Sequence, residues 1–336
     1  MTYLLSLLDK SPIPEAASAQ QALAHTVKLA QRAEQLGYHR YWVAEHHGSK
    51  VYAGPAPEIL VAHILAKTSR IRVGSGGVML QHYSPYKVAE VFRLLEALAP
   101  GRVDLGVGKA PGGMPLTTRA LQALHDPDRK PAFDAQLAQL DAFLHGFVPD
   151  GHPLAGAVAT PQPGQLPQRW LLGGSPQSAA LAARLGWDFV YAGHFNGDAD
   201  NIEASIAAYR KATGRPPALA LFALATQTQE QAEKLVQGLR IYKLHLPTGQ
   251  SFNLPSLEGA VEFARQTGVT DFRTEEQRPY VIAGTADHVR AELDALHQRW
   301  GIREFVIDTP VAGFAERLAS IELLAAAHKT AQALAA

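Results

Sequence analysis

The chain alternates between short apolar segments and longer amphipathic segments along nearly its whole length, and this alternation limits the folds that it can adopt. The short segments are rich in β-branched and aromatic residues, which favours strands. The longer ones place apolar residues three and four positions apart, which predicts helices. Glycine follows several of the helical segments, where a left-handed residue commonly ends a helix. Strands that alternate with helices form parallel sheets, because a parallel crossover needs a connection of helical length.

Eight strand-like segments predict an α/β fold, the closed parallel (β/α)8 TIM barrel. A doubly wound open sheet remains an alternative, because one sequence does not show whether the sheet closes. The run Tyr280–Thr285 is a candidate ninth strand that competes for the seventh position. The eight segments are Tyr3–Leu8, Arg40–Val43, Ile71–Leu80, Val103–Val107, Arg169–Leu172, Phe189–Ala192, Leu219–Ala225 and Glu304–Ile307.

Two regions interrupt the repeat. Gly146–Pro167 is rich in Gly, Pro and Ala and predicts an excursion after the fourth strand. Residues 246–279 predict an insertion before the last unit. The chain has no internal repeat and no linker-like segment, and 336 residues is an ordinary length for one barrel. We therefore expect residues 1–336 to form a single barrel domain that carries the insertion at about 246–279.

The charge balance and the absence of cysteine exclude several classes of protein. Lys and Arg total 31, as do Asp and Glu, and zero net charge argues against nucleic acid or an anionic membrane as the main partner. Without cysteine there is no disulfide, thiolate metal site or cysteine nucleophile, and the fourteen histidines show no convincing metal-site spacing. The first apolar run is too short to span a membrane and lacks an export signal. We expect a cytoplasmic protein of enzyme size.

Polar residues gather where the predicted strands end. In a parallel barrel the carboxyl ends of the strands surround the active site, so these residues predict a pocket. The alternative is that strand ends are simply where solvent begins and polar residues collect. The strand ends carry Asp9, Glu45-His46-His47, Gly76-Gly77 with Met79, Lys109, Gly174-Ser175, His194, Thr226 and Asp308.

The segment "GGSPQS", which ends at Ser178, predicts an anion site. Ser175 suits the N-cap of a helix and Pro176 its first turn. Free N–H groups, the helix dipole and the hydroxyls of Ser175 and Ser178 favour a phosphate there, and Gly174 lets a ligand approach the backbone. A plain helix start remains the alternative.

Two further features near the strand ends each allow two interpretations, one functional and one structural. Gly76 and Gly77 lie inside a strand-like run, where glycine costs stability. A flat ligand against the backbone or a β-bulge would explain them equally well. Lys109 follows a strand and is suited to meet a phosphate, although an exposed lysine without a role fits as well. The glycines around Lys109 do not match a dinucleotide-binding fingerprint.

Three stretches together resemble the bacterial luciferase-like flavin monooxygenase family: "AEHH", "GSGGVMLQHYSPYKVAEVFRLLEALAPGRVDLGVGKAPGG" and "LLGGSPQSAALAARLGWDFVYAGHF". The opening "LLDKSPI" is similar to an uncharacterised branch whose members begin "LLDxxPI". The similarity runs in order through nearly all of residues 1–330. The collective pattern is specific, although no single motif is.

The resemblance implies a flavin-dependent oxidoreductase, a monooxygenase that uses reduced FMN and O2 to oxidise a small organic substrate. It further implies a barrel that holds FMN at the carboxyl ends of its strands, a homodimer, and a separate NAD(P)H-dependent flavin reductase that supplies reduced FMN. The cofactor also makes physical sense, because oxygen chemistry without thiols or a bound metal needs an organic electron donor.

The resemblance assigns the cofactor-binding residues position by position. Ser175 and Ser178, with Gly174, fall where the family binds the flavin phosphate. Gly76 and Gly77 fall at its non-prolyl cis peptide beneath the flavin ring. Met79 and Lys109 complete the expected cofactor-binding set.

The resemblance also assigns the catalytic residues. His46 falls on the histidine near the reacting edge of the flavin, and an imidazole with an ordinary pKa exchanges protons near neutral pH. Glu45 would orient His46 and His47 would buffer it.

Two departures and several alternatives remain. Lys109 stands where the branch usually has arginine, and Met114 where it commonly has aspartate, so we expect weaker flavin binding or altered chemistry. The alternatives are a deazaflavin-dependent hydride-transfer dehydrogenase and a non-catalytic FMN-binding protein on the same fold, with a sugar-phosphate barrel enzyme as a third. The sequence does not identify the organic substrate.

Overall fold

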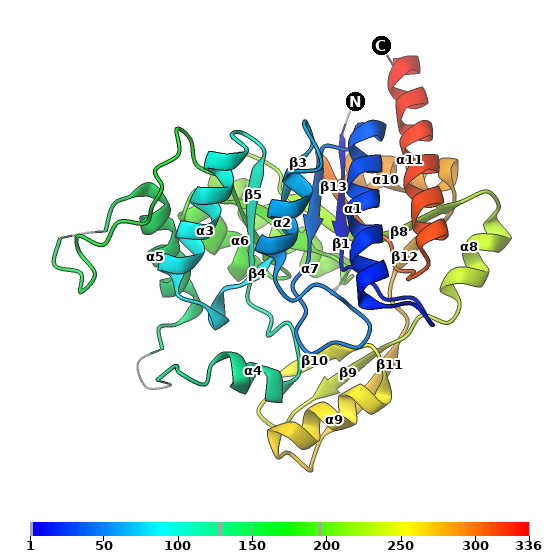
Figure 1. The fold of residues 1–336 in the computed structure, drawn as a ribbon. Helices are drawn as coiled ribbons and strands as arrows, with labels where there is room; N and C mark the ends of the chain where they lie inside the picture. Colours follow the sequence, from blue (N-terminus) through cyan, green and yellow to red (C-terminus); the bar gives the residue numbers. More distant parts are fainter. Residues whose placement is uncertain (1–2, 127–129, 149, 195–196, 336) are drawn as a thin grey trace.

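Eight parallel strands close into a barrel in the computed structural model, which describes residues 3–126, 130–148, 150–194 and 197–335 (Figure 1). Each strand pairs with the next, and the last pairs with the first. This closure confirms the (β/α)8 TIM barrel and excludes the open sheet. The ring is formed by β1 (Leu4–Asp9), β2 (Arg40–Val43), β3 (Arg72–Ser75), β5 (Val103–Gly108), β6 (Gln168–Gly173), β7 (Asp188–Ala192), β8 (Ala218–Thr226) and β13 (Glu304–Asp308).

Helices lie outside the ring (Figure 1), as the amphipathic segments predict. Within the described residues, no helix is both long and apolar enough to cross a membrane. The described part of 146–167 forms turns and irregular chain between α5 and β6, which confirms the excursion. The helices are α1 (Ala19–Leu36), α2 (Pro57–Leu65), α3 (Pro85–Leu98), α4 (Pro115–Leu121), α5 (Phe133–His145), α6 (Pro176–Arg184), α7 (Ala199–Thr213), α8 (Gln229–Val236), α10 (Ala286–Trp300) and α11 (Phe314–Ala335).

The third predicted strand is divided in two. We expected one strand over Ile71–Leu80, but β3 ends at Ser75 and a short strand, β4 (Val78–Met79), follows after Gly76 and Gly77. A Cβ on Gly76 would lie 2.6 Å from Leu8 Cδ1, and one on Gly77 would lie 2.8 Å from the Gly106 carbonyl oxygen. Packing against the backbone of β5 therefore requires glycine at position 77, whether or not a ligand lies there. At position 76 the nearest atom belongs to the flexible Leu8 side chain, so the requirement is weaker.

The insertion before the last unit forms a small antiparallel sheet of its own. Its strands are β9 (Ile241–His245), β10 (Ser251–Leu254) and β11 (Arg273–Gln277), and α9 (Leu257–Thr267) packs on them. The extra sheet therefore begins a strand earlier than the expected residue 246. It lies beside α4 on the side where the barrel strands end (Figure 1).

The candidate ninth strand exists but does not compete for a place in the ring. β12 (Val281–Thr285) pairs in parallel with the carboxyl half of β8, from Phe222 to Thr226. The amino half of β8 pairs with β7 and β13, so β8 itself is the seventh strand of the barrel.

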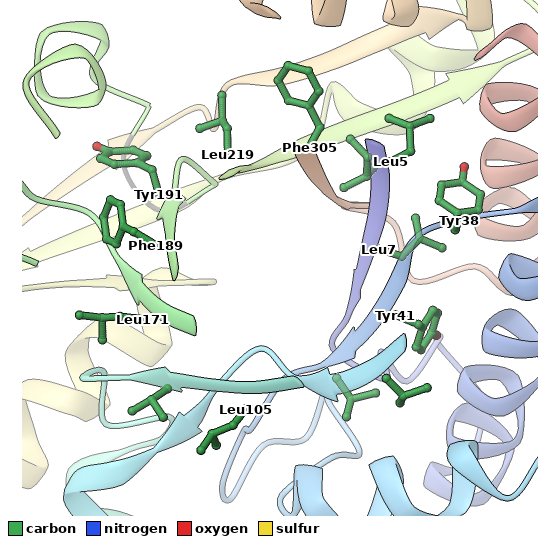
Figure 2. Close-up of a cluster of buried hydrophobic side chains, with 14 of the residues drawn as sticks. Leu5, Leu7, Tyr38, Tyr41, Leu105, Leu171, Phe189, Tyr191, Leu219 and Phe305 are labelled. Atoms are coloured by element: carbon green, nitrogen blue, oxygen red, sulfur yellow. The ribbon is translucent and has the colours of Figure 1, made fainter. Parts of the chain in front are cut away.

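Side chains along the barrel strands alternate between two apolar layers, as strand geometry requires. In β13, Phe305 and Ile307 join the layer between the strands and the helices, whereas Val306 joins the packed interior. Figure 2 shows side chains of the outer layer from β1, β2, β5, β6, β7, β8 and β13. The same alternation turns Glu304 and Asp308 toward the interior, where each meets a cation.

A buried charged network fills the amino end of the barrel interior. The Arg40 guanidinium on β2 lies 2.7 Å from Asp104 on β5 and 2.5 Å from Glu304 on β13. It also lies 4.6 Å from the ring of Trp170. Arg40 is 2% exposed, so these interactions are shielded from water. One cation thus joins three strands that are not neighbours in the ring.

Replacing Arg40 with methionine should destabilise the fold strongly. Glu304 would remain as a buried carboxylate without its cation, while Asp104 would keep only Arg72 at 2.7 Å. Removing one partner of a buried ion pair costs about 3–5 kcal/mol. Urea denaturation measures this loss. Arg32→Met is the matched control, because Arg32 forms a pair with Glu322 in which both side chains are 40% exposed, and exposed pairs contribute about 1 kcal/mol or less. Equal losses for the two variants would contradict the role of Arg40.

Candidate functional site

Partly exposed side chains lie at the carboxyl ends of the strands. Phe222 in β8 and Met79 in β4 are both partly exposed, although the residues on either side of each are buried. We call this region the barrel mouth and define it by the residues that end or directly follow the barrel strands there. The predicted site residues all belong to it.

His46 lies at the barrel mouth against Tyr52, with 4.4 Å between the ring centroids. Its side chain is partly exposed, but Nδ1 is shielded from solvent and has no hydrogen-bond partner within the described residues. Burial lowers the pKa of His46 to about 3, and the charges of Lys10 and His47 add to the effect. His46 is therefore neutral near pH 7 and offers a ligand one N–H donor and one nitrogen acceptor. This replaces the expectation of an ordinary imidazole pKa.

The structure corrects the expected partner of Glu45. Its Oε1 lies 2.6 Å from Nε2 of His47 and accepts a hydrogen bond from the Tyr83 hydroxyl at 2.9 Å. Its Oε2 accepts the backbone N–H of Met79 at 3.1 Å. Residues 45 and 47 point to the same side of the extended chain and residue 46 to the other. The fully buried Glu45 thus fixes the strand ends around His46 without contacting His46 itself.

His47 fastens the loop that follows β5 to the end of β2. Its backbone N–H donates to the Gly112 carbonyl at 2.7 Å, and it forms a β-bridge with Gly113. The next residue, Met114, packs into the small apolar core of the insertion. Met114, which stands where the branch commonly has aspartate, therefore has a structural role, because its apolar side chain joins the barrel mouth to the insertion.

The helix start predicted at Ser175 forms as expected at the start of α6. Ser175 caps the helix by accepting the Ser178 backbone N–H at 3.2 Å, and the two hydroxyl oxygens lie 3.2 Å apart. Both side chains are partly exposed. The Gly174 carbonyl accepts a hydrogen bond from Asn201 at 2.7 Å, which ties α7 to this turn. Two hydroxyls and the N–H groups of a helix start therefore face one accessible position.

The remaining predicted cofactor residues surround the same mouth. The peptide bond between Gly76 and Gly77 is cis, as the resemblance implies. Lys109 is exposed directly after β5, and within the described residues it forms no ion pair or hydrogen bond. The register that pairs Val107 with Leu171 places Lys109 level with Gly173, on the strand beside the one that leads to Ser175.

Sequence reasoning did not assign Lys10 to the site. Its Nζ lies 2.7 Å from Asp308 Oδ2 and 4.8 Å from the centroid of the Phe222 ring. Burial disfavours the charged form, but the Asp308 carboxylate outweighs this and raises the pKa of Lys10, which therefore stays an ammonium. Lys10 follows β1 and Asp308 ends β13, so the sequence places both at strand ends. The sequence does not show that they meet, because β1 and β13 become neighbours only when the ring closes.

His194 completes this side of the barrel mouth. Its ring lies 5.7 Å from that of Phe222, and burial, with the charges of Lys10 and His46, lowers its pKa well below the ordinary value. The mouth therefore holds a lysine ammonium between two neutral imidazoles.

Comparison with known proteins identifies the family. The family model for luciferase-like monooxygenases matches residues 4–309. The chain belongs to this family. It is 45% identical to N-acetyl-S-alkylcysteine monooxygenase of Bacillus subtilis strain 168, over 95% of this chain and 96% of that protein. It is 34% identical to the luciferase-like monooxygenase of Escherichia coli strain K12, over 96% of each. The crystal structure of apo-MsnO8 shares 33% identity and covers 98% of both chains with a TM-score of 0.77.

These comparisons confirm the family inferred from the sequence motifs and place the chain among oxidoreductases that act as monooxygenases. Several solved flavin-dependent enzymes share its fold, among them one bound to FMN and one bound to a deazaflavin adduct, at 18% and 16% identity.

The lowered pKa of His46 predicts how stability changes with pH. In the unfolded chain His46 takes up a proton near its ordinary pKa of 6.5, whereas in the folded protein it does so only near pH 3. The unfolded state binds more protons between these values, so the free energy of unfolding should fall as the pH drops from 7 to 5. Urea denaturation at both pH values should show a smaller fall for His46→Gln. The same pH dependence in parent and variant would contradict the neutral state of His46.

Proposed function

We propose that the protein is an FMN-dependent monooxygenase, which uses reduced FMN and O2 to oxidise a small organic substrate at the barrel mouth. One observation carries the proposal. The chain belongs to the luciferase-like family, and one end of its barrel holds two features together. One is a helix start with two adjacent hydroxyls, and the other is a neutral histidine with an unpartnered nitrogen. A separate NAD(P)H-dependent flavin reductase would supply the reduced FMN.

The residues of the barrel mouth fit FMN. Ser175, Ser178 and the N–H groups at the start of α6 would hold the phosphate, and Lys109 is placed on the neighbouring strand to add a positive charge. The side-chain-free backbone at Gly76 and Gly77 would lie beneath the flat ring. When bound in its reduced form, FMN supplies the electrons that the reaction with O2 requires.

The protein's own residues would handle protons and exclude water. His46 is neutral and would share a proton with the substrate through a hydrogen bond to its unpartnered Nδ1, while the buried Glu45 and His47 hold the surrounding strand ends in place. The insertion, joined to the mouth through Met114, would shield the reacting groups from water.

The relative at 45% identity suggests the first substrates to test. That protein is named for N-acetyl-S-alkylcysteines, so small N-acylated thioethers form the leading class for this chain.

We also propose that the protein is a homodimer. Apolar side chains on neighbouring helices support this, because Ile59 on α2 and Leu94 and Leu98 on α3 are 67%, 50% and 71% exposed. Light scattering should give twice the mass of one chain, and a value near 36.2 kDa would contradict the dimer.

Incorporation of labelled oxygen tests the function. With reduced FMN, isotopically labelled O2 and N-acylated thioethers, the product should carry one labelled oxygen atom, in amounts above those from flavin autoxidation alone. His46→Ala should lower turnover roughly a hundredfold or more, the usual effect of losing a positioned acid or base, and leave FMN affinity nearly unchanged. His63→Ala, which removes an exposed histidine on α2, is the control. Hydride transfer to or from a deazaflavin without O2 would establish the dehydrogenase alternative instead.

Removing both hydroxyls at the start of α6 should weaken FMN binding. Neutral hydrogen bonds contribute about 1 kcal/mol each and charge-assisted ones about twice that, so Ser175→Ala with Ser178→Ala should weaken FMN roughly tenfold to several hundredfold. Riboflavin, which has no phosphate, should bind the parent and the variant alike. Ser18→Ala removes an equivalent cap from α1 and controls for lost helix capping. Unchanged FMN titration in the double variant would place the phosphate elsewhere.

A further inference from the structure

We propose that Lys10 binds an anionic oxygen of the small molecule at the barrel mouth, which makes organic acids the substrate class that this site would take. The inference deepens the proposed function and rests on it for the reaction, but the binding of an acid is measurable on its own.

The first support is the unused hydrogen-bonding capacity of Lys10. An ammonium has three N–H donors, and within the described residues the structure shows one acceptor for Nζ, the Asp308 carboxylate at 2.7 Å. The rings of Phe222 and Tyr52 lie 4.8 and 5.8 Å from Nζ and offer only their faces. The Lys10 side chain is 14% exposed, so a ligand in the mouth is able to reach it.

The second support is the unpartnered nitrogen of His46. Its Nδ1 is shielded from solvent and lacks a hydrogen-bond partner within the described residues, and the charge of Lys10 acts on the same ring. A shielded polar atom without a partner indicates a position that a ligand completes. Lys10 and His46 thus present two incomplete polar groups to one region.

The charges around Lys10 are paired, so that they do not repel an incoming anion. Asp9 is neutralised by Arg317, at 2.7 Å, and Asp308 by Lys10. Arg317 also acts on Asp308, so this group of charges is balanced. On the other side of Lys10, His46 is neutral, as is His194. An incoming carboxylate would therefore meet the ammonium without facing a second unpaired negative charge.

The aromatic rings beside Lys10 indicate that the rest of the ligand is apolar. Tyr52 lies against His46, and Phe222 lies against His194, so both rings form apolar walls next to the imidazoles. A molecule with a carboxylate at Lys10 and an apolar body along these rings would place its oxidisable part near His46. The anionic oxygen has two possible sources, the carboxylate of a substrate or the pyrimidine-edge oxygen of reduced FMN.

Calorimetry of acids against their uncharged amides tests the proposal. The probes are N-acetylmethionine and octanoate, each paired with its amide and titrated into the full chain without FMN. The parent should bind each acid about tenfold or more tightly than its amide, as expected for a charge-assisted hydrogen bond. Lys10→Met combined with Asp308→Asn should abolish the preference. The double change removes both charges, so that no carboxylate is left buried alone.

Three further measurements complete the design. Asp308→Asn alone leaves Lys10 without its counter-charge and should strengthen acid binding. Lys87→Met, which removes an exposed lysine paired with Glu90, should keep the parent's preference. Anaerobic titration of reduced and oxidised FMN tests the other source, because an anionic flavin oxygen at Lys10 predicts that the double variant selectively loses affinity for reduced FMN.

The outcomes are distinct. Loss of the acid preference assigns the anion to the substrate, and selective loss of reduced FMN assigns it to the cofactor. If the double variant retains both properties, or if the parent shows neither, Lys10 is not an anion-binding residue. Failure of the monooxygenase proposal would appear as absent oxygen incorporation, with the calorimetric preference for acids still present.

Discussion

The pairing of β1 with β13 is the constraint on which the site depends. It closes the ring and sets Leu8 beside Asp308, so that Lys10, two residues after Leu8 and on the same side of the chain, reaches the Asp308 carboxylate. At the other end of the same pair, the Ser6 hydroxyl donates to Glu304 at 2.6 Å. A slip of one residue would turn both carboxylates out of the barrel, because side chains alternate along a strand. Closure and the chemistry of the mouth therefore depend on one register.

The inward-facing side chains form layers along the barrel axis, and each layer has a different role. At the amino end, Arg40 satisfies carboxylates from non-neighbouring strands. Above it, Trp42 and Trp170 fill the interior, with their rings 5.3 Å apart. At the carboxyl end, the level of Lys10 and His46 remains open to the mouth. Stability is thus concentrated where the strands begin and reactive groups where they end, as in other parallel barrels.

The fold and one part of the site followed from local patterns, whereas the other part required contacts between distant segments. The cap at Ser175 was predictable because N-cap preference is set within one turn of helix. Gly77 was recognised, but the close approach of the Gly106 backbone, which requires glycine there, is not visible in the sequence. The alternation of side chains argues against a contact between Glu45 and His46, but the resemblance assigned Glu45 to orient His46, and only the structure shows that Glu45 pairs with His47. Lys10 was missed because Asp308 lies at the far end of the chain.

A crystal structure of the protein soaked with FMN tests the central claim, that the barrel mouth is a flavin site built around these groups. The account predicts the phosphate at Ser175 and Ser178, at the start of α6, and the ring over Gly76 and Gly77 on the side of His46. A phosphate bound away from α6, or a flavin ring outside the barrel mouth, would contradict it.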